Sequence, residues 1–230
     1  MLKGSLSVAK FTVPDLKFAP RDGGNARGHE GFEMVLKAAL QVLIDEGYKD
    51  LTLRRIAAEC GMKASNITYY FKTKNELIEA LLEAVVSSYH GTIEAAMDQA
   101  GDDPELKLEN LITLILEDIT TKKTTFIFPE LWALSNHSQF VKKIVNALYK
   151  TERLFFDSII KEMNPNISAQ EREIVGLFIV ASLEGMTIFA GYGKPYKKHM
   201  PLIKNISYKF FGELIRNLRP GEVEGALSAA

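Results

Sequence analysis

Helical periodicity extends through most of the chain from Gly31 onward and constrains the fold more than any other feature. In the first such segment, apolar residues recur at spacings of three and four positions, which places them on one face of a helix. They are Phe32, Val35, Leu36, Ala39, Leu40, Leu43 and Ile44. Gly47 follows, and glycine commonly ends a helix because it adopts positive φ without strain. No two segments have the alternation and turn of a β-hairpin. The pattern predicts an all-α protein of about nine helices.

Helix start and stop signals divide the rest of the chain. Thr73 with Glu76, and Ser168 with Glu171, have the spacing of a capping box, in which a hydroxyl and a carboxylate satisfy N–H groups at a helix start. Asp103 before Pro104 is another start signal. The further helices are expected at residues 53–59, 63–70, 73–99, 104–121, 126–135, 138–163, 168–190 and 200–218.

Charge is unevenly distributed between the two ends of the chain. Residues 1–75 hold twelve basic and eight acidic side chains, a net charge of +4, whereas residues 76–230 hold sixteen and twenty-one, a net charge of −5. Such a difference is expected when only one module contacts phosphates, although ordinary variation is the alternative. Residues 1–28 lack helical periodicity and contain several prolines and glycines, so we expect an irregular N-terminal arm there.

The composition argues against several classes of protein. Cys60 is the only cysteine, so an internal disulfide and a cysteine-based zinc site are both unavailable. His29, His90, His137 and His199 lack metal-ligand spacing, and no nucleophile elbow, phosphate loop or dinucleotide-binding motif is present. We therefore expect no catalytic residue, metal or cofactor. No signal peptide or membrane-spanning run is recognised, which predicts a cytoplasmic protein that does not bind a membrane.

Residues 53–71 have the pattern of two short helices that cross steeply. Ala57 is small enough for a close crossing, and Gly61 suits the turn because it tolerates left-handed backbone. The inward positions are apolar: Ile56, Cys60, Met62, Ile67 and Tyr70. The outward positions of the second helix are small or polar: Lys63, Ala64, Ser65, Asn66, Thr68 and Tyr69.

This outward face suits the major groove of DNA, which admits one helix and presents hydrogen-bonding base edges. Asn66 can bond adenine in bidentate fashion, and Ser65 or Thr68 can contact a base or a phosphate. Lys63, Lys72 and Lys74 stand at helix ends, where phosphates pass. The alternative is a helical hairpin within an all-α core, with these polar side chains only solvated. Because every inward position is apolar, the helix-turn-helix is favoured.

Residues 32–78 resemble the N-terminal domain of the TetR family of transcriptional regulators. The matching segments are Gly47-Tyr48, Leu51-Thr52-Leu53-Arg54-Arg55-Ile56-Ala57, Gly61-Met62, Tyr69-Tyr70-Phe71 and Lys72-Thr73-Lys74-Asn75-Glu76-Leu77. The resemblance implies a three-helix DNA-binding domain at 29–75 in an all-α homodimer with a C-terminal ligand-binding domain. The sequence departs from the common family pattern at Lys63 and Thr68. The candidate DNA-binding residues are Thr52, Arg54, Arg55, Lys63, Ser65, Asn66, Thr68, Tyr69, Lys72 and Lys74.

Residues 76–230 are expected to form a ligand-binding and dimerisation domain. The 168–190 helix is apolar nearly all round and the 200–218 helix has a strong apolar face, so the two are expected to form a four-helix interface with a second copy. Packing within one subunit is the alternative. Aromatic residues with a few polar neighbours are typical of a small-molecule pocket, and equally of a core. The candidate ligand-binding residues are Phe128, Trp132, Asn136, Phe155, Phe178 and Glu184. Glu184 stands out because a carboxylate in an apolar helix needs a partner or a ligand amine.

The predicted function is a ligand-responsive repressor that binds a palindromic operator in double-stranded DNA as a homodimer. A small-molecule effector, whose identity the sequence leaves unknown, would release it. The alternative is a helix-turn-helix regulator or adaptor controlled by a protein partner, without a small-molecule pocket. An enzyme is disfavoured because the chain lacks the catalytic motifs named above.

Overall fold

The computed structural model describes residues 26–225, and every regular element in this range is a helix. The all-α prediction is therefore confirmed. Most of the arm expected at 1–28 lies outside the described residues, but 26–28 already belong to the first helix. The helices form two compact units, and α4 and α7 contribute to both.

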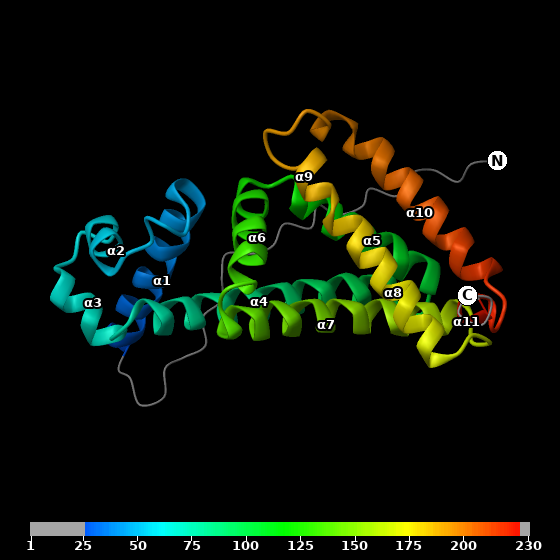
Figure 1. Ribbon diagram of the computed structural model, residues 1–230, viewed down its shortest axis with the longest axis horizontal. Helices are drawn as coiled ribbons and strands as arrows, with labels where there is room; N and C mark the ends of the chain where they lie inside the picture. The colour runs from blue at the N-terminus through cyan, green and yellow to red at the C-terminus, as the bar shows by residue number, and fades with distance from the viewer. Residues whose placement is uncertain (1–25, 226–230) are drawn as a thin grey trace. The chain divides into compact units, whose positions relative to one another are not determined.

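The first unit contains the helix-turn-helix. It includes α1 (Ala26–Glu46), α2 (Leu53–Glu59), α3 (Ala64–Tyr70) and α4 (Lys74–Ala100) as far as Tyr89. It also includes α6 (Lys122–Ser135) and the beginning of α7 (Gln139–Met163). The short α2 and α3 pack against each other and α1 packs on α2, as the blue to cyan ribbons of Figure 1 show. On its other side α1 packs against α6, so this unit extends beyond the three helices of the predicted DNA-binding domain.

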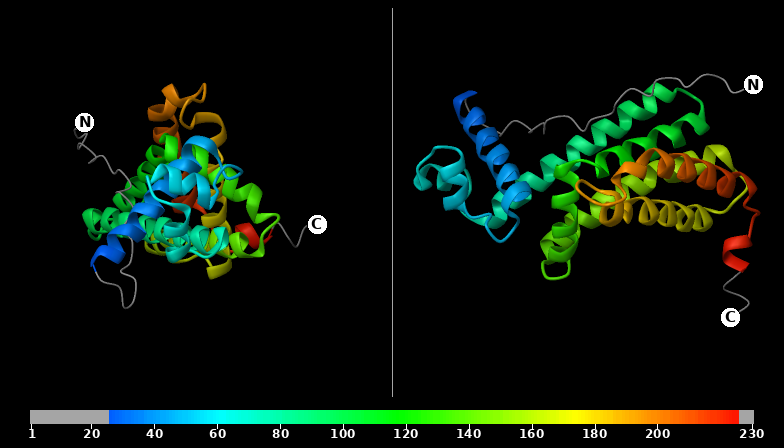
Figure 2. Two further views of the ribbon diagram at one scale, coloured as in Figure 1. Left: turned by 90° about the vertical axis from the view of Figure 1, so that its left-hand side faces the viewer. Right: turned by 90° about the horizontal axis from the view of Figure 1, so that it is seen from above.

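The second unit is built around α5 (Pro104–Ile119), which packs against α10 (Met200–Asn217), α8 (Ala169–Glu184) and α9 (Met186–Ala190). A short 3₁₀ helix, η1 (Lys197–His199), precedes α10, and α11 (Glu222–Gly225) follows it. In Figure 2, α8 in yellow and α10 in orange to red run alongside each other. The fully buried side chains of this core include Leu108, Leu111, Phe156, Ile179 and Ile215.

Capping groups begin the helices of the second unit where the sequence placed them. The Asp103 carboxylate accepts from Glu105 N–H at 3.0 Å and Leu106 N–H at 3.2 Å at the start of α5. At the start of α8, Ser168 Oγ accepts from Glu171 N–H at 3.1 Å and the Glu171 carboxylate accepts from Ser168 N–H at 3.0 Å. These bonds satisfy N–H groups that have no partner within the helix.

The structure contains all nine predicted helices and differs from the prediction at several boundaries. The helix α1 begins at Ala26 and α6 begins at Lys122, both earlier than expected. The predicted 168–190 helix is two helices, α8 and α9, because it is interrupted at Gly185. Glycine has a low helix propensity, which makes it a favourable point for such an interruption. The described residues also contain α11, which periodicity did not predict because it is only one turn long.

The segment Ala169–Ala190 is long and apolar enough to cross a membrane by length and composition, with a mean hydropathy of 1.7. The expectation that no such run exists was therefore too strict. The segment forms core contacts along one side, where Val175, Ile179 and Leu183 are buried. A helix that packs in a core and carries a second apolar face has this composition without spanning a bilayer.

Candidate nucleic-acid interface

The turn between α2 and α3 has the geometry that the sequence predicted. Thr52 Oγ1 accepts from Arg55 N–H at 3.1 Å and caps α2. Gly61 has φ of 65°, the left-handed backbone that glycine adopts without strain. The Met62 N–H then donates to Ala57 O at 2.8 Å and closes the turn. Ala57 is 3% exposed, so its small side chain lies where the two helices meet.

The outward face of α3 is open to solvent. Lys63, Ala64, Ser65, Asn66, Thr68 and Tyr69 are all exposed. Ile67, which lies among them in sequence, is fully buried, so the helix has one inward and one outward side. The Thr68 hydroxyl donates to Ser65 O at 2.9 Å and leaves its lone pairs available as acceptors. The alternative of a helical hairpin with these residues packed against neighbours is therefore wrong for this face.

Tyr70 holds α3 close to α1. A Cβ built on Gly31 would lie 2.0 Å from Tyr70 Oη, so only a residue without a side chain lets the ring occupy this position. The Tyr70 ring also meets that of Tyr69 edge-on, with centroids 5.2 Å apart. Tyr69 itself is 75% exposed, which is unusual for an aromatic side chain unless a partner covers it.

The two arginines of α2 have different surroundings. Arg54 is exposed. Arg55 bonds two carboxylates, with Nε 2.9 Å from Glu46 Oε2 and a terminal nitrogen 2.8 Å from Glu59 Oε2. The hydrogen bonds to Glu46, and then those to Glu59, raise the pKa of the Arg55 guanidinium. Arg55 thus joins α2 to the end of α1, and both of its carboxylate partners offset its charge toward phosphate.

The lysines that lead into α4 also differ. Lys72 is exposed, and its N–H donates to Glu76 Oε2 at 2.9 Å. Lys74 is half-buried: its Nζ donates to Tyr48 O at 2.8 Å and lies 3.8 Å from the centroid of the Tyr48 ring. Burial lowers the pKa of Lys74, and the charges of Asp50 and Glu130 oppose that change. In this conformation the ammonium group faces the α1–α2 connection.

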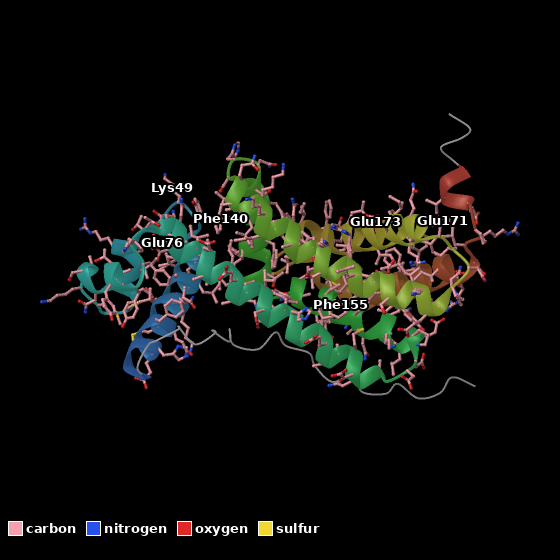
Figure 3. The ribbon with its side chains drawn as sticks, turned by 90° about the horizontal axis from the view of Figure 1, so that it is seen from below. Lys49, Glu76, Phe140, Phe155, Glu171 and Glu173 are labelled. Carbon is pink, nitrogen blue, oxygen red and sulfur yellow. The ribbon has the colours of Figure 1, made fainter. Side chains whose placement is uncertain are left out.

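Glu130 is a residue of this region that sequence reasoning missed. It lies on α6, directly after Pro129, and its carboxylate accepts from Tyr48 N–H. Gly47 has φ of 84°, and a Cβ there would lie 2.6 Å from Glu130 Oε1. Lys122 at the start of α6 also pairs with Asp45 near the end of α1. Lys49 and Glu76, labelled in Figure 3, belong to the same unit. No local pattern signals the Glu130 contact, because its partner is 82 positions away.

Comparison with known proteins identifies the domain. Residues 35–81 match the family described as bacterial regulatory proteins of the tetR family. This chain belongs to the TetR family of transcriptional regulators.

The likeness to TetR-family regulators extends beyond the matched segment. An uncharacterised HTH-type transcriptional regulator of Xanthobacter autotrophicus is 25% identical over 176 residues, which cover 75% of this chain and 85% of that protein. The regulator BetI of an Escherichia coli strain is 22% identical over 182 residues, covering 76% of this chain and 89% of BetI. These relatives are named as transcriptional regulators and not as enzymes.

Solved structures show the same fold. A TetR transcription regulator from Haloarcula marismortui superposes with a TM-score of 0.62 at 19% identity, covering 81% of this chain and 94% of that one. A putative regulator from Saccharomonospora viridis, in complex with choline, superposes with a TM-score of 0.65 at 16% identity, covering 82% and 96%.

The six candidate ligand-binding residues divide between the two units of this TetR-family fold. Phe128 is buried, Trp132 is half-buried and Asn136 is exposed, all in the first unit. In the second unit, Phe155 faces α4, where its ring lies 5.6 Å from that of His90; Figure 3 labels Phe155. Phe178 is 50% exposed, and one side of its ring contacts Phe211 at a centroid distance of 6.2 Å. These residues therefore do not form one common group within either unit.

Glu184 has the buried surroundings that its sequence context predicted. Tyr149 Oη donates to Glu184 Oε2 at 3.3 Å. Burial raises the pKa of Glu184 to about 7, and the nearby charge of Asp118 adds to this effect, while the Tyr149 hydrogen bond opposes it.

Large apolar side chains remain uncovered on the helices predicted to dimerise, and we call them the apolar strip. Each is between 46% and 65% exposed. The strip consists of Ile174, Leu177 and Phe178 on α8, Ile188 and Phe189 on α9, and Leu202, Ile206 and Phe210 on α10. Contiguous exposed apolar residues of this kind mark interaction surfaces.

Proposed function

We propose that this TetR-family regulator is a repressor that binds a palindromic operator as a homodimer and is released by a small molecule. Residues 29–75 would contact DNA, and residues 76–230 would dimerise and bind the effector. Such a protein acts where bacterial DNA lies, in the cytoplasm, and requires no membrane.

The observation that carries the proposal is the exposed face of α3. Its polar side chains are presented to solvent on a helix fixed by the buried Ile67. Asn66 is the exposed amide on this face, and an amide can bond the N6 and N7 atoms of adenine together. Lys63 and Lys72 lie exposed at the two ends of α3, where they can reach phosphates.

Homodimerisation is supported by the apolar strip. The strip residues lie on α8, α9 and α10, and a second copy can cover them by a two-fold contact in which each subunit buries the same face. A dimer would hold two α3 helices at a fixed separation, about one turn of DNA or 34–36 Å for adjacent half-sites. Operator symmetry then follows from protein symmetry.

Release by a small molecule is supported by the related structure that holds choline. An effector that binds only one arrangement of the dimer weakens DNA binding by the difference in its affinity for the two arrangements, typically about 1–3 kcal/mol. The unit that contains α3 also contains α6, whose Glu130 bonds the α1–α2 connection. Movement of α6 would therefore reach the DNA-binding helices through a direct contact.

The DNA-binding part of the proposal is tested by selecting bound fragments from genomic DNA and measuring their affinity by fluorescence anisotropy. Asn66→Ala should reduce discrimination against a mismatched operator by about 1–3 kcal/mol. Lys63→Ala or Lys72→Ala should weaken every duplex and reduce the slope of log affinity against log salt by about 0.9. Asn146→Ala, an exposed amide on α7, is the matched control. Equal discrimination by the Asn66 variant and the control would contradict base readout by α3.

The dimer is tested by light scattering coupled to size-exclusion chromatography. Ile206→Asp places a charge in the apolar strip and should produce monomers with weakened operator binding. Leu154→Asp is the matched control, because Leu154 is 58% exposed on α7 and outside the strip. If both variants remain dimeric, the strip is not the interface.

A further inference from the structure

Three acidic residues meet inside the second unit without a matching set of positive charges. Asp118 on α5 is 5% exposed, and Glu152 on α7 is 7% exposed. Glu184 on α8 joins them through Tyr149 of α7, whose hydroxyl donates to its carboxylate at 3.3 Å. Tyr149 and Glu152 are three residues apart and so share a face of α7. We call Asp118, Glu152 and Glu184 the acidic cluster.

Glu152 is the most unusual member of the cluster. Its Oε1 atom is buried and has no hydrogen-bond partner in the structure. A buried carboxylate without a partner is costly, and native structures rarely keep one without a reason. Burial raises the pKa of Glu152 well above its ordinary value, and the charge of Glu184 adds to this while that of Arg153 opposes it.

A second buried polar group points to the same place. Thr187 is fully buried on α9, and its hydroxyl has no hydrogen-bond partner. It follows Glu184 by three residues, which places both on one side of the α8–α9 segment. The helix α9 packs against α5, which carries Asp118. Two oxygen atoms from different helices are thus buried here and unsatisfied.

The neighbouring groups of the protein do not neutralise this cluster. Arg153 is the basic residue whose charge acts on Glu152, but the two form no ion pair within 4 Å. A metal ion is disfavoured by geometry, because no three His, Cys, Asp or Glu side chains among residues 26–225 are arranged to hold one. An organic cation needs fewer and less regular ligands, and the ring of Tyr149 can contact its apolar parts.

We propose that the effector of this regulator is an organic cation, an amine or a quaternary ammonium, whose positive charge is held by Glu152, Glu184 and Asp118. This inference rests on the proposed ligand-responsive function and specifies the chemistry of its effector. Tyr149 and Thr187 supply further oxygen atoms around the charge. Without the cation, the acidic cluster destabilises the unit that contains it.

The binding test compares cations with neutral molecules of the same shape by isothermal titration calorimetry at pH 8. One pair is choline and dimethylbutanol, in which a tert-butyl group replaces the trimethylammonium; the other is butylammonium and butanol. At least one cation should bind about tenfold or more tightly than its neutral counterpart, as expected for a charge-assisted contact. Glu152→Gln should remove most of that difference. Glu173→Gln, an exposed acid on α8 labelled in Figure 3, should keep it.

A second measurement does not depend on the choice of cation. At pH 8 and without ligand, Glu152→Gln should raise the melting temperature by about 2–4 °C, because a neutral amide is cheaper to bury than a carboxylate. The Glu173→Gln control should change it little. The proposal is overturned if neither cation binds more tightly than its neutral counterpart, or if Glu152→Gln leaves the melting temperature unchanged or lowers it.

Operator binding separates this inference from the proposed function. If a cation binds at the acidic cluster but leaves the protein–operator complex intact, the cation site stands and ligand-responsive release fails. If the operator is released only by a neutral or anionic compound, the proposed function stands and the cationic effector is refuted. If no duplex is bound, the repressor assignment fails whatever the calorimetry shows.

Discussion

Gly47→Ala tests how the end of α1 is joined to α6. Gly47 has φ of 84°, and its missing Cβ would lie 2.6 Å from Glu130 Oε1. The Oε2 atom of the same carboxylate accepts from Tyr48 N–H. An alanine at this position therefore meets two separate costs. One is the left-handed backbone, and the other is displacement of Glu130 from its hydrogen bond.

Gly61→Ala provides the matched control. Gly61 has φ of 65°, and no atom lies within 4 Å of its Cβ position, so only the backbone cost applies. Left-handed backbone costs an L-residue about 1–2 kcal/mol, and the lower unfolded-state entropy of alanine offsets about 0.4–1 kcal/mol of this. We expect Gly61→Ala to cost about 1 kcal/mol. Loss of the half-buried Glu130 bond adds about 1 kcal/mol for Gly47→Ala, which then costs about 2 kcal/mol.

Urea denaturation followed by circular dichroism measures both costs. With a slope of about 2 kcal/mol per molar urea, the midpoint for Gly47→Ala should lie about 0.5 M below that for Gly61→Ala. In a Glu130→Ala background the excess should vanish, because the displaced carboxylate is already absent. Equal midpoints in the wild-type background, or an excess that persists without Glu130, would refute the reasoning.

Three further predictions concern stability and reactivity. The unfolded chain loses the Glu184 proton above about pH 4.5 but the folded chain keeps it to about pH 7, so stability should fall as pH rises through this window; thermal melts should show it, and Glu184→Gln should flatten it. Ser168→Ala should cost about 1 kcal/mol in urea by removing the cap of α8, and an equal loss for the exposed Ser158→Ala would contradict this. Burial raises the pKa of Cys60, so iodoacetamide should alkylate it more slowly at pH 7 than it alkylates a free thiol, and equal rates would refute this.

Local chemistry explains which parts of the fold were predictable from sequence. Helix starts at Asp103 and Ser168 and the turn at Gly61 depend on groups within a few positions, so their patterns are visible in the chain itself. The exposed face of α3 was predictable for the same reason, because the periodicity that buries Ile67 also turns its neighbours outward. The interruption at Gly185 was not predicted, since apolar residues continue on both sides of it.

Contacts between distant segments set the roles that were not predictable. Lys74 matched a family position, but the structure directs its ammonium group to Tyr48, 26 positions earlier. Arg55 likewise meets Glu46 across the α1–α2 connection. The acidic cluster shows the same limit: Glu184 was conspicuous on an apolar helix, whereas Glu152 lies on an amphipathic helix where a glutamate is expected to be solvated. Only the folded chain shows that it is buried.

The apolar strip links the behaviour of this regulator to its abundance. If pairing covers the strip, a newly made chain exposes it until it finds a second copy, and folding stability rises with the concentration of the protein itself. Dilution would then do more than separate subunits, since lone chains would offer Ile206, Phe210 and their neighbours to any other sticky surface. The number of copies in a cell would thus have a physical lower bound, below which chains are lost to proteases or aggregates before they can regulate anything.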